Sequence, residues 1–182
     1  MQIFSENDLD FSFPNNWHVI KLDDHEFYRR NIEPIGANLK SVDFLIKHND
    51  TGFDKLLLIE VKDFRGYAVA NRKRQANGEL IQEIIEKALH SITINYLGHF
   101  NQIPEFKIIN TLTNNSPNEI NLVLFLEEDN SLTLRQKQLF YSNSLRNNIE
   151  IKIKQRLWKN ASIKFRILSR EELRDRDEFK VN

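Results

Sequence analysis

The chain has 182 residues, which suffices for one domain with a sizeable core but is cramped for two, so we expect a single domain over residues 1–182. Its 26 Lys and Arg residues balance 26 Asp and Glu residues, so any basic surface for nucleic acid must arise from local clustering. The absence of cysteine excludes disulfide bonds, thiolate zinc sites and a cysteine nucleophile.

The N-terminal part of the chain predicts a lead-in, a strand and a helix. Residues 1–16 are polar and mixed, so we expect them to be irregular. They lack the basic and apolar regions of a secretory signal, and no later stretch reaches the apolar length of a membrane span, so we expect a cytoplasmic protein without membrane contact. Residues 17–22 alternate apolar with polar, as in a strand. Asp23 and Asp24 favour a helix start because acidic side chains stabilise the positive end of the helix dipole, and Pro34 ends that helix.

Residues 42–62 predict an antiparallel β-hairpin. Val42, Phe44 and Ile46 alternate with Asp43, Leu45 and Lys47, and residues 56–61 are almost entirely aliphatic, so both runs suit strands better than helices. The intervening residues 49–52 have the sequence Asn-Asp-Thr-Gly, and three of these residue types form turns because they tolerate a positive φ.

The register of this hairpin brings three charged groups together. With the turn centred between Thr51 and Gly52, paired residues have numbers that sum to 103, so Asp43 lies opposite Glu60, and Lys62 projects to the same face. Two adjacent carboxylates are costly to bury, and a divalent cation such as Mg²⁺ would compensate. A neighbouring lysine can orient a water or stabilise phosphate charge. The alternative is a solvated cross-strand ion pair worth under about 1 kcal/mol.

Positive charge gathers directly after the hairpin. Arg65 is followed by the run Arg72, Lys73 and Arg74, and residues 67–70 between them predict a short third strand. These four cations could contact phosphates beside a metal site, which would position nucleic acid without distinguishing its sequence. A solvated loop is the alternative, because runs of charge usually face water.

The rest of the chain alternates helices, loops and strands. The clearest helix spans residues 79–100, because its apolar residues recur at helical spacing. After it we expect a loop over residues 110–119, a buried strand over 120–126, a helix over 134–158 interrupted near Asn147, a strand over 162–168 and a polar tail. This order of elements predicts an α/β fold in which a mixed sheet is flanked by helices.

Asp43, followed after a turn by residues 60–62 (Glu-Val-Lys), resembles the D…(D/E)-x-K motif of the PD-(D/E)XK nuclease superfamily. The resemblance is specific over residues 36–66, which carry similar apolar flanks, although Val42 occupies the place of the usual proline before the first aspartate. It implies the restriction-endonuclease-like fold, with an αβββαβ core and additions at both ends.

The resemblance also implies roles for the site residues. Asp43 and Glu60 would be ligands of Mg²⁺ or Mn²⁺, with the Val61 carbonyl as a third, and Lys62 would position or activate the attacking water. Helices on either side of the hairpin often add further side chains in this superfamily. The accessory candidates are Asp23 or Glu26 before the hairpin and Gln82 or Lys87 after it, with capping or simple solvent exposure as the alternative for each.

The function that the resemblance implies is metal-dependent hydrolysis of phosphodiester bonds in nucleic acid, with DNA as the expected substrate. One alternative is a nuclease-fold module that binds nucleic acid without catalysis. Another is a protein-interaction module in which Asp43, Glu60 and Lys62 form only structural ion pairs. No helix-turn-helix or other reader domain is evident, so specificity would come from loops, a homodimer or a partner protein.

Overall fold

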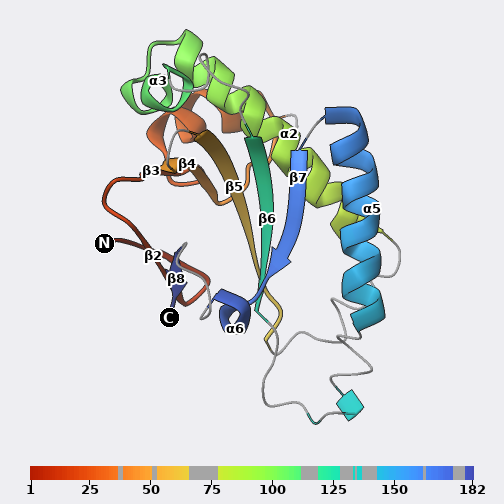
Figure 1. Ribbon diagram of the computed structural model, residues 1–182. Coiled ribbons are helices and arrows are strands. Elements are labelled where there is room, and N and C mark those ends of the chain that lie inside the picture. The colour runs from red at the N-terminus through yellow and green to blue at the C-terminus, as the bar shows by residue number, and fades with distance from the viewer. Residues whose placement is uncertain are drawn as a thin grey trace.

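The computed structural model describes residues 1–36, 39–50, 53–65, 78–111, 119–127, 133, 135–136, 143–161, 163–173 and 179–182. These residues form an α/β fold with two sheets (Figure 1). The larger sheet has the order β3-β4-β5-β6-β7, with strands β3 (His18–Lys21), β4 (Phe44–Asp50), β5 (Phe53–Asp63), β6 (Glu119–Glu127) and β7 (Ile163–Leu168). The smaller sheet has the order β1-β2-β8, with strands β1 (Gln2–Glu6), β2 (Leu9–Phe13) and β8 (Lys180–Val181).

The larger sheet changes from antiparallel to parallel at its centre. Strands β3, β4 and β5 form an antiparallel meander, whereas β5, β6 and β7 run parallel. Parallel neighbours need long crossovers, and helices supply them here. The crossover helices are α2 (Glu79–Phe100) and α3 (Pro104–Thr111) between β5 and β6, and α5 (Asn143–Ala161) between β6 and β7.

The helices cover one face of the larger sheet. Strand side chains that point to this face, such as Leu58 and Leu124, share a core with Ile84 of α2 and Ile153 of α5. Each of these four side chains is fully buried. The apolar spacing predicted α2 with the bounds that the structure has, because a helix that packs on a sheet needs one continuous apolar stripe.

The opposite face of the larger sheet lies against the smaller sheet through a second, phenylalanine-rich core. The ring centroid of Phe11 on β2 lies 5.1 Å from those of Phe44 on β4 and Phe125 on β6. The prediction of an irregular lead-in over residues 1–16 is therefore wrong. The alternation of Leu9, Phe11 and Phe13, all fully buried, is the strand signal that favours β2.

Three other predictions need correction or lie outside the described residues. Helix α5 continues through Asn147 without interruption, because that side chain is exposed and imposes no packing demand. The helix expected after Asp23 is instead a π-helical turn, η1 (Tyr28–Ile32), followed by a 3₁₀ turn, η2 (Glu33–Ile35). The strand that joins the β4–β5 hairpin to form the meander is β3, which precedes the hairpin in the chain. The third strand expected after the hairpin, at residues 67–70, lies outside the described residues. Helix α3 and the short helix α6 (Arg170–Leu173) complete the fold.

Gly98 of α2 packs directly against Phe106 of α3, and alanine there is expected to destabilise the fold. An alanine Cβ would clash with two ring atoms of Phe106. That ring is buried against His25 and Phe27, so it cannot move away without repacking. We expect Gly98→Ala to lower the free energy of unfolding in urea by about 1–3 kcal/mol, although alanine is the better helix former. Adding Phe106→Leu should recover part of the loss, and a Gly98→Ala protein of unchanged stability would contradict the prediction.

Candidate functional site

The β4–β5 hairpin has the register that its turn predicts. Phe44 pairs with Ile59 and Asp50 pairs with Phe53, so each pair of residue numbers sums to 103. Asp43 directly precedes β4, which places it beside the β5 segment that continues past Ile59. The predicted register is therefore confirmed over this ladder, which ends at the Phe44–Ile59 pair, one residue before the predicted pair of Asp43 with Glu60.

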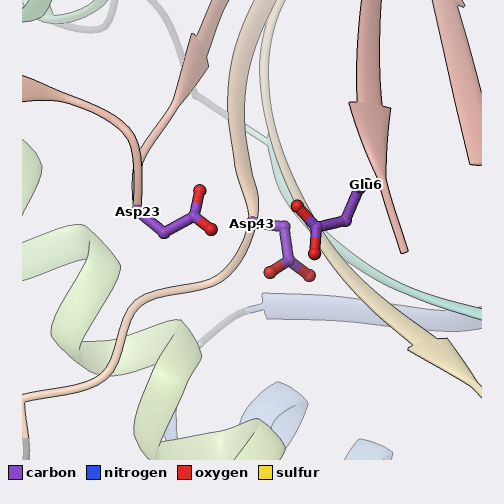
Figure 2. A group of neighbouring side chains, drawn as sticks. All are labelled: Glu6, Asp23 and Asp43. Atoms are coloured by element: carbon purple, nitrogen blue, oxygen red, sulfur yellow. The ribbon is translucent and has the colours of Figure 1, made fainter. Parts of the chain in front are cut away.

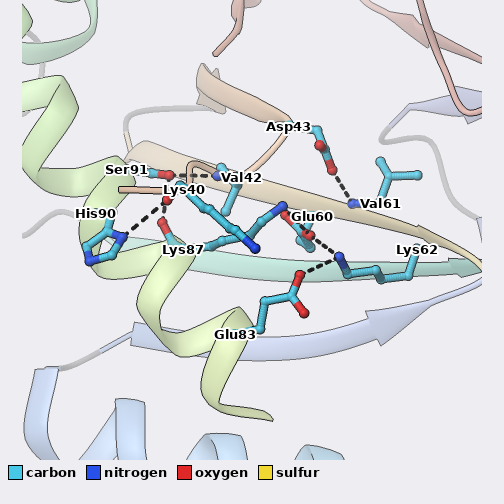
Figure 3. A network of polar contacts seen from close by, with 10 residues as sticks. All are labelled: Lys40, Val42, Asp43, Glu60, Val61, Lys62, Glu83, Lys87, His90 and Ser91. Atoms are coloured by element: carbon cyan, nitrogen blue, oxygen red, sulfur yellow. Dashed lines mark hydrogen bonds and ion pairs between the residues drawn. The ribbon is translucent and has the colours of Figure 1, made fainter. Parts of the chain in front are cut away.

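Asp43 binds the backbone of β5 where β4 no longer flanks it. Its Oδ2 accepts a hydrogen bond of 2.6 Å from the Val61 amide (Figure 3). Its own carbonyl accepts from the Leu22 amide at 2.9 Å, so the Asp43 backbone is fixed as well. Because the amide and carbonyl of one strand residue point to the same neighbour, the Val61 carbonyl faces the edge that holds Asp43.

Glu60 is the buried centre of an ion-pair network on the α2 face of the sheet. Its Oε1 lies 2.8 Å from the Lys62 Nζ and 2.7 Å from the Lys87 Nζ (Figure 3). The Lys62 Nζ also donates to Glu83 Oε1 at 2.8 Å. Glu83 and Lys87 are four residues apart on α2, so both face β5 from successive turns. The Glu60 side chain is fully buried, and its Oε2 has no hydrogen-bond partner among the described residues.

Burial and neighbouring charges shift the pKa values of Asp43 and Lys62. Burial and the charge of Glu60 raise the pKa of Asp43 to about 8, against the opposing effects of Lys87 and the Val61 amide. Burial disfavours the charge of Lys62, but Glu60 and Glu83 outweigh it and raise the pKa of that lysine. At neutral pH Lys62 is therefore charged, while Asp43 holds a proton that a nearby cation would displace.

Two further carboxylates approach Asp43 from the other side. One oxygen each from Glu6, Asp23 and Asp43 lie within 4.8 Å of one another (Figure 2). Glu6 ends β1 and pairs with Lys21 at 3.0 Å, and Asp23 lies two residues after β3. The Asp23 Oδ1 is buried without a hydrogen-bond partner in the described part of the chain.

Asp23 was a candidate from the sequence, whereas Glu6 was missed. Glu6 reaches Asp43 only because the β1–β2 hairpin lies over the larger sheet. The alternation of apolar residues in β2 is the signal that could have found this hairpin.

The two accessory candidates of α2 differ in position. Lys87 lies in the network, on Glu60. Gln82 is exposed, donates to Glu86 at 2.7 Å and accepts from Arg156, so it lies outside the network. Glu26 is also exposed and pairs with Arg30 at 2.7 Å, so the structure does not bring it to Asp43.

The cations expected to contact phosphates are described only in part. The Arg65 guanidinium lies on the Asp63 carboxylate, with Nε at 2.8 Å from Oδ1, and also donates to the Asn7 carbonyl. Burial disfavours the charge of Asp63, but Arg65 outweighs it and lowers the pKa of that carboxyl. Arg72, Lys73 and Arg74 lie outside the described residues.

Comparisons with known proteins add no information about the candidate site. No protein-family model matches the sequence, and no curated protein or solved structure is significantly similar to it. Among the described helices, none has the length and apolar character that a membrane-spanning helix needs.

Proposed function

We propose that the protein is a metal-dependent nuclease of PD-(D/E)XK type, with nucleic acid, expected to be DNA, as its substrate. The observation that carries this proposal is the convergence of Asp43, Glu60 and Lys62 at one end of the β4–β5 hairpin, where one buried oxygen of Glu60 has no hydrogen-bond partner among the described residues. The meander β3-β4-β5, followed by a helix and the parallel strand β6, supports a restriction-endonuclease-like fold as part of the proposal.

The side chains around Asp43 fit a hard divalent cation such as Mg²⁺ or Mn²⁺. Asp43 and Glu60 would hold the ion with the Val61 carbonyl, and Asp23 and Glu6 offer further oxygens on the other side of Asp43. Oxygen is the ligand that these ions prefer. Glu60 and Asp23 each have a buried oxygen without a hydrogen-bond partner among the described residues, and a cation would offset the desolvation of these oxygens. When bound, the ion would lower the pKa of a water and stabilise the charge that develops on phosphorus.

The protein's own residues would orient the reaction. Lys62 is held by Glu60 and Glu83 and carries a proton, so it could orient the attacking water or neutralise a phosphate oxygen. Lys87 neutralises Glu60 from the helix side, which keeps this buried carboxylate compensated before any ion binds.

The direct test is cleavage of supercoiled plasmid and of labelled single strands at low salt, with Mg²⁺, Mn²⁺ or EDTA. We expect the wild type to nick the plasmid only with metal. Asp43→Ala and Lys62→Ala should each lower the rate by about 10²-fold or more, the scale of removing a positioned catalytic group. Arg30→Gln, on an exposed side chain, is the control and should cleave as the wild type does.

A second candidate is a non-catalytic module that binds nucleic acid or protein. Two lysines already neutralise Glu60, so the network is compensated without metal, as a purely structural set of ion pairs would be. A wild type that neither cleaves any of these substrates nor binds Mn²⁺ would favour this candidate over the nuclease. A cleavage rate per mole of protein that rises with protein concentration would instead indicate that a homodimer is the active form.

A further inference from the structure

Helix α5 and the adjoining strand β7 carry a concentration of positive charge. Residues 150–166 contain six Lys or Arg residues and one acidic residue, although the whole chain is balanced. The helix buries only a narrow stripe of Ile149, Ile153 and Leu157 against the sheet among its side chains that the structure describes. Four basic residues of the helix, Lys152, Lys154, Arg156 and Lys159, are exposed. The helix itself lies beside β7 (Figure 1).

This basic region contains a groove of about 550 Å³. The groove is lined by Lys154, Gln155, Trp158, Lys159, Lys164 and Phe165. Trp158 is 53% exposed, which is unusual for so large an apolar side chain. The Lys164 Nζ lies 5.9 Å from the centroid of its ring, so the indole sits among cations.

The chemistry of the groove matches a strand of nucleic acid. An exposed indole offers a face on which an unpaired base can stack, and the lysines that line the groove can contact phosphates of the same strand. Lys154 pairs with Glu150 at 2.6 Å, and Lys164 pairs with Glu119. Exposed pairs of this kind are weak, so a phosphate can replace the carboxylate. None of the described residues that line the groove is acidic.

Helix α5 contacts α2 beside the candidate metal site. Arg156 on α5 donates to Gln82 at 3.2 Å, and the next residue of α2, Glu83, binds Lys62. Helix α5, which supplies four of the six groove residues, therefore contacts the part of α2 that binds Lys62.

We propose that this α5–β7 surface, formed by the six groove residues, binds a single-stranded segment of nucleic acid. One base stacks on Trp158, and Lys154 and Lys159 contact the flanking phosphates. A duplex hides its base faces, so the exposed indole favours unpaired strands or ends. The inference that this surface contacts the substrate rests on the proposed nuclease function. Binding of nucleic acid to the surface, however, requires neither metal nor cleavage.

The test measures binding of a labelled oligothymidylate of 20 nucleotides by fluorescence anisotropy in EDTA, so that cleavage cannot contribute. We expect Trp158→Ala to weaken binding by about 5- to 100-fold, the range for loss of one stacked base. The double variant Lys154→Ser, Lys159→Ser should lower the slope of log affinity against log salt by about 1.4, since each phosphate contact on a single strand contributes about 0.7. Quenching of wild-type tryptophan emission should accompany binding, because the other tryptophan, Trp17, is buried.

Phe100→Ala is the matched control, because Phe100 is an exposed aromatic residue on α2, outside the groove. Wild-type binding that these groove variants leave unchanged would overturn the inference, as would the absence of binding. Binding to phosphatidylglycerol vesicles but not to the oligonucleotide would assign the surface to an anionic membrane instead. A Trp158→Ala protein that binds the oligonucleotide as the wild type does would disprove the role of this surface. If that protein also retains metal-dependent nicking, the proposed nuclease function still holds.

Discussion

Asp43→Asn is expected to stabilise the metal-free protein above neutral pH. The pKa of Asp43 is raised to about 8 in the folded protein, from an ordinary value of 3.8. Between these pH values the unfolded chain releases this proton first, so the Asp43 contribution to stability falls as pH rises from about 4 to about 8 and stays low above. Asparagine cannot ionise but keeps an oxygen for the Val61 amide. One pKa unit corresponds to about 1.4 kcal/mol, so we expect a gain of about 2–5 kcal/mol near pH 9 and a gain of under about 2 kcal/mol near pH 5.

The same substitution is expected to abolish stabilisation by metal. In the wild type, Mn²⁺ would favour the ionised form of Asp43, and a ligand at 100 times its Kd adds about 2.7 kcal/mol to the free energy of unfolding. The measurement is urea unfolding with EDTA or Mn²⁺ at about pH 5 and about pH 9. Glu26→Gln, an exposed carboxylate, is the control and should shift neither response. An Asp43→Asn protein that is less stable at both pH values, or that still responds to Mn²⁺, would disprove the assignment of Asp43.

The hairpin register and α2 could be predicted because local rules decide them. The turn residues fix which strand residues oppose each other, and all seven pairs from Phe44–Ile59 to Asp50–Phe53 follow that register. The apolar stripe of α2 likewise carries its own signal over 22 residues. Asp43, Glu60 and Lys62 were predicted to converge because their positions depend on this one hairpin.

The rest of the candidate site depends on long-range packing that spacing does not encode. Glu83 and Lys87 look like an ordinary exposed i, i+4 pair in the sequence, yet each contacts a residue of β5 because α2 crosses the sheet there. Glu6 joins Asp43 only through the phenylalanine-rich core that places β1. The α5–β7 surface was missed for a related reason, because its charges are spread over a helix and an edge strand and form no continuous run.

Glu60→Gln is expected to lower the free energy of unfolding in EDTA by about 3–5 kcal/mol. The substitution leaves Lys62 and Lys87 beside a neutral amide at a site where the carboxylate is fully buried. Breaking a buried pair from one side costs this much because the remaining charge loses its compensation. Glu150→Gln is the matched control: it removes the carboxylate of Lys154 in an exposed i, i+4 pair and should cost only about 0.3–0.5 kcal/mol.

The double variant Glu60→Gln, Lys87→Met separates the two roles of Glu60. Methionine keeps the apolar volume of the lysine stem without its charge, so the double variant should regain about 1–3 kcal/mol over Glu60→Gln, measured as a coupling energy in urea. It should nevertheless neither bind Mn²⁺ nor cleave, because the ligand is still missing. Restored stability together with retained metal binding would show that Glu60 serves only the ion-pair network. If Glu60→Gln alone lowered the free energy of unfolding by less than about 1 kcal/mol, the ion pairs of Glu60 would instead contribute no more than exposed surface pairs do.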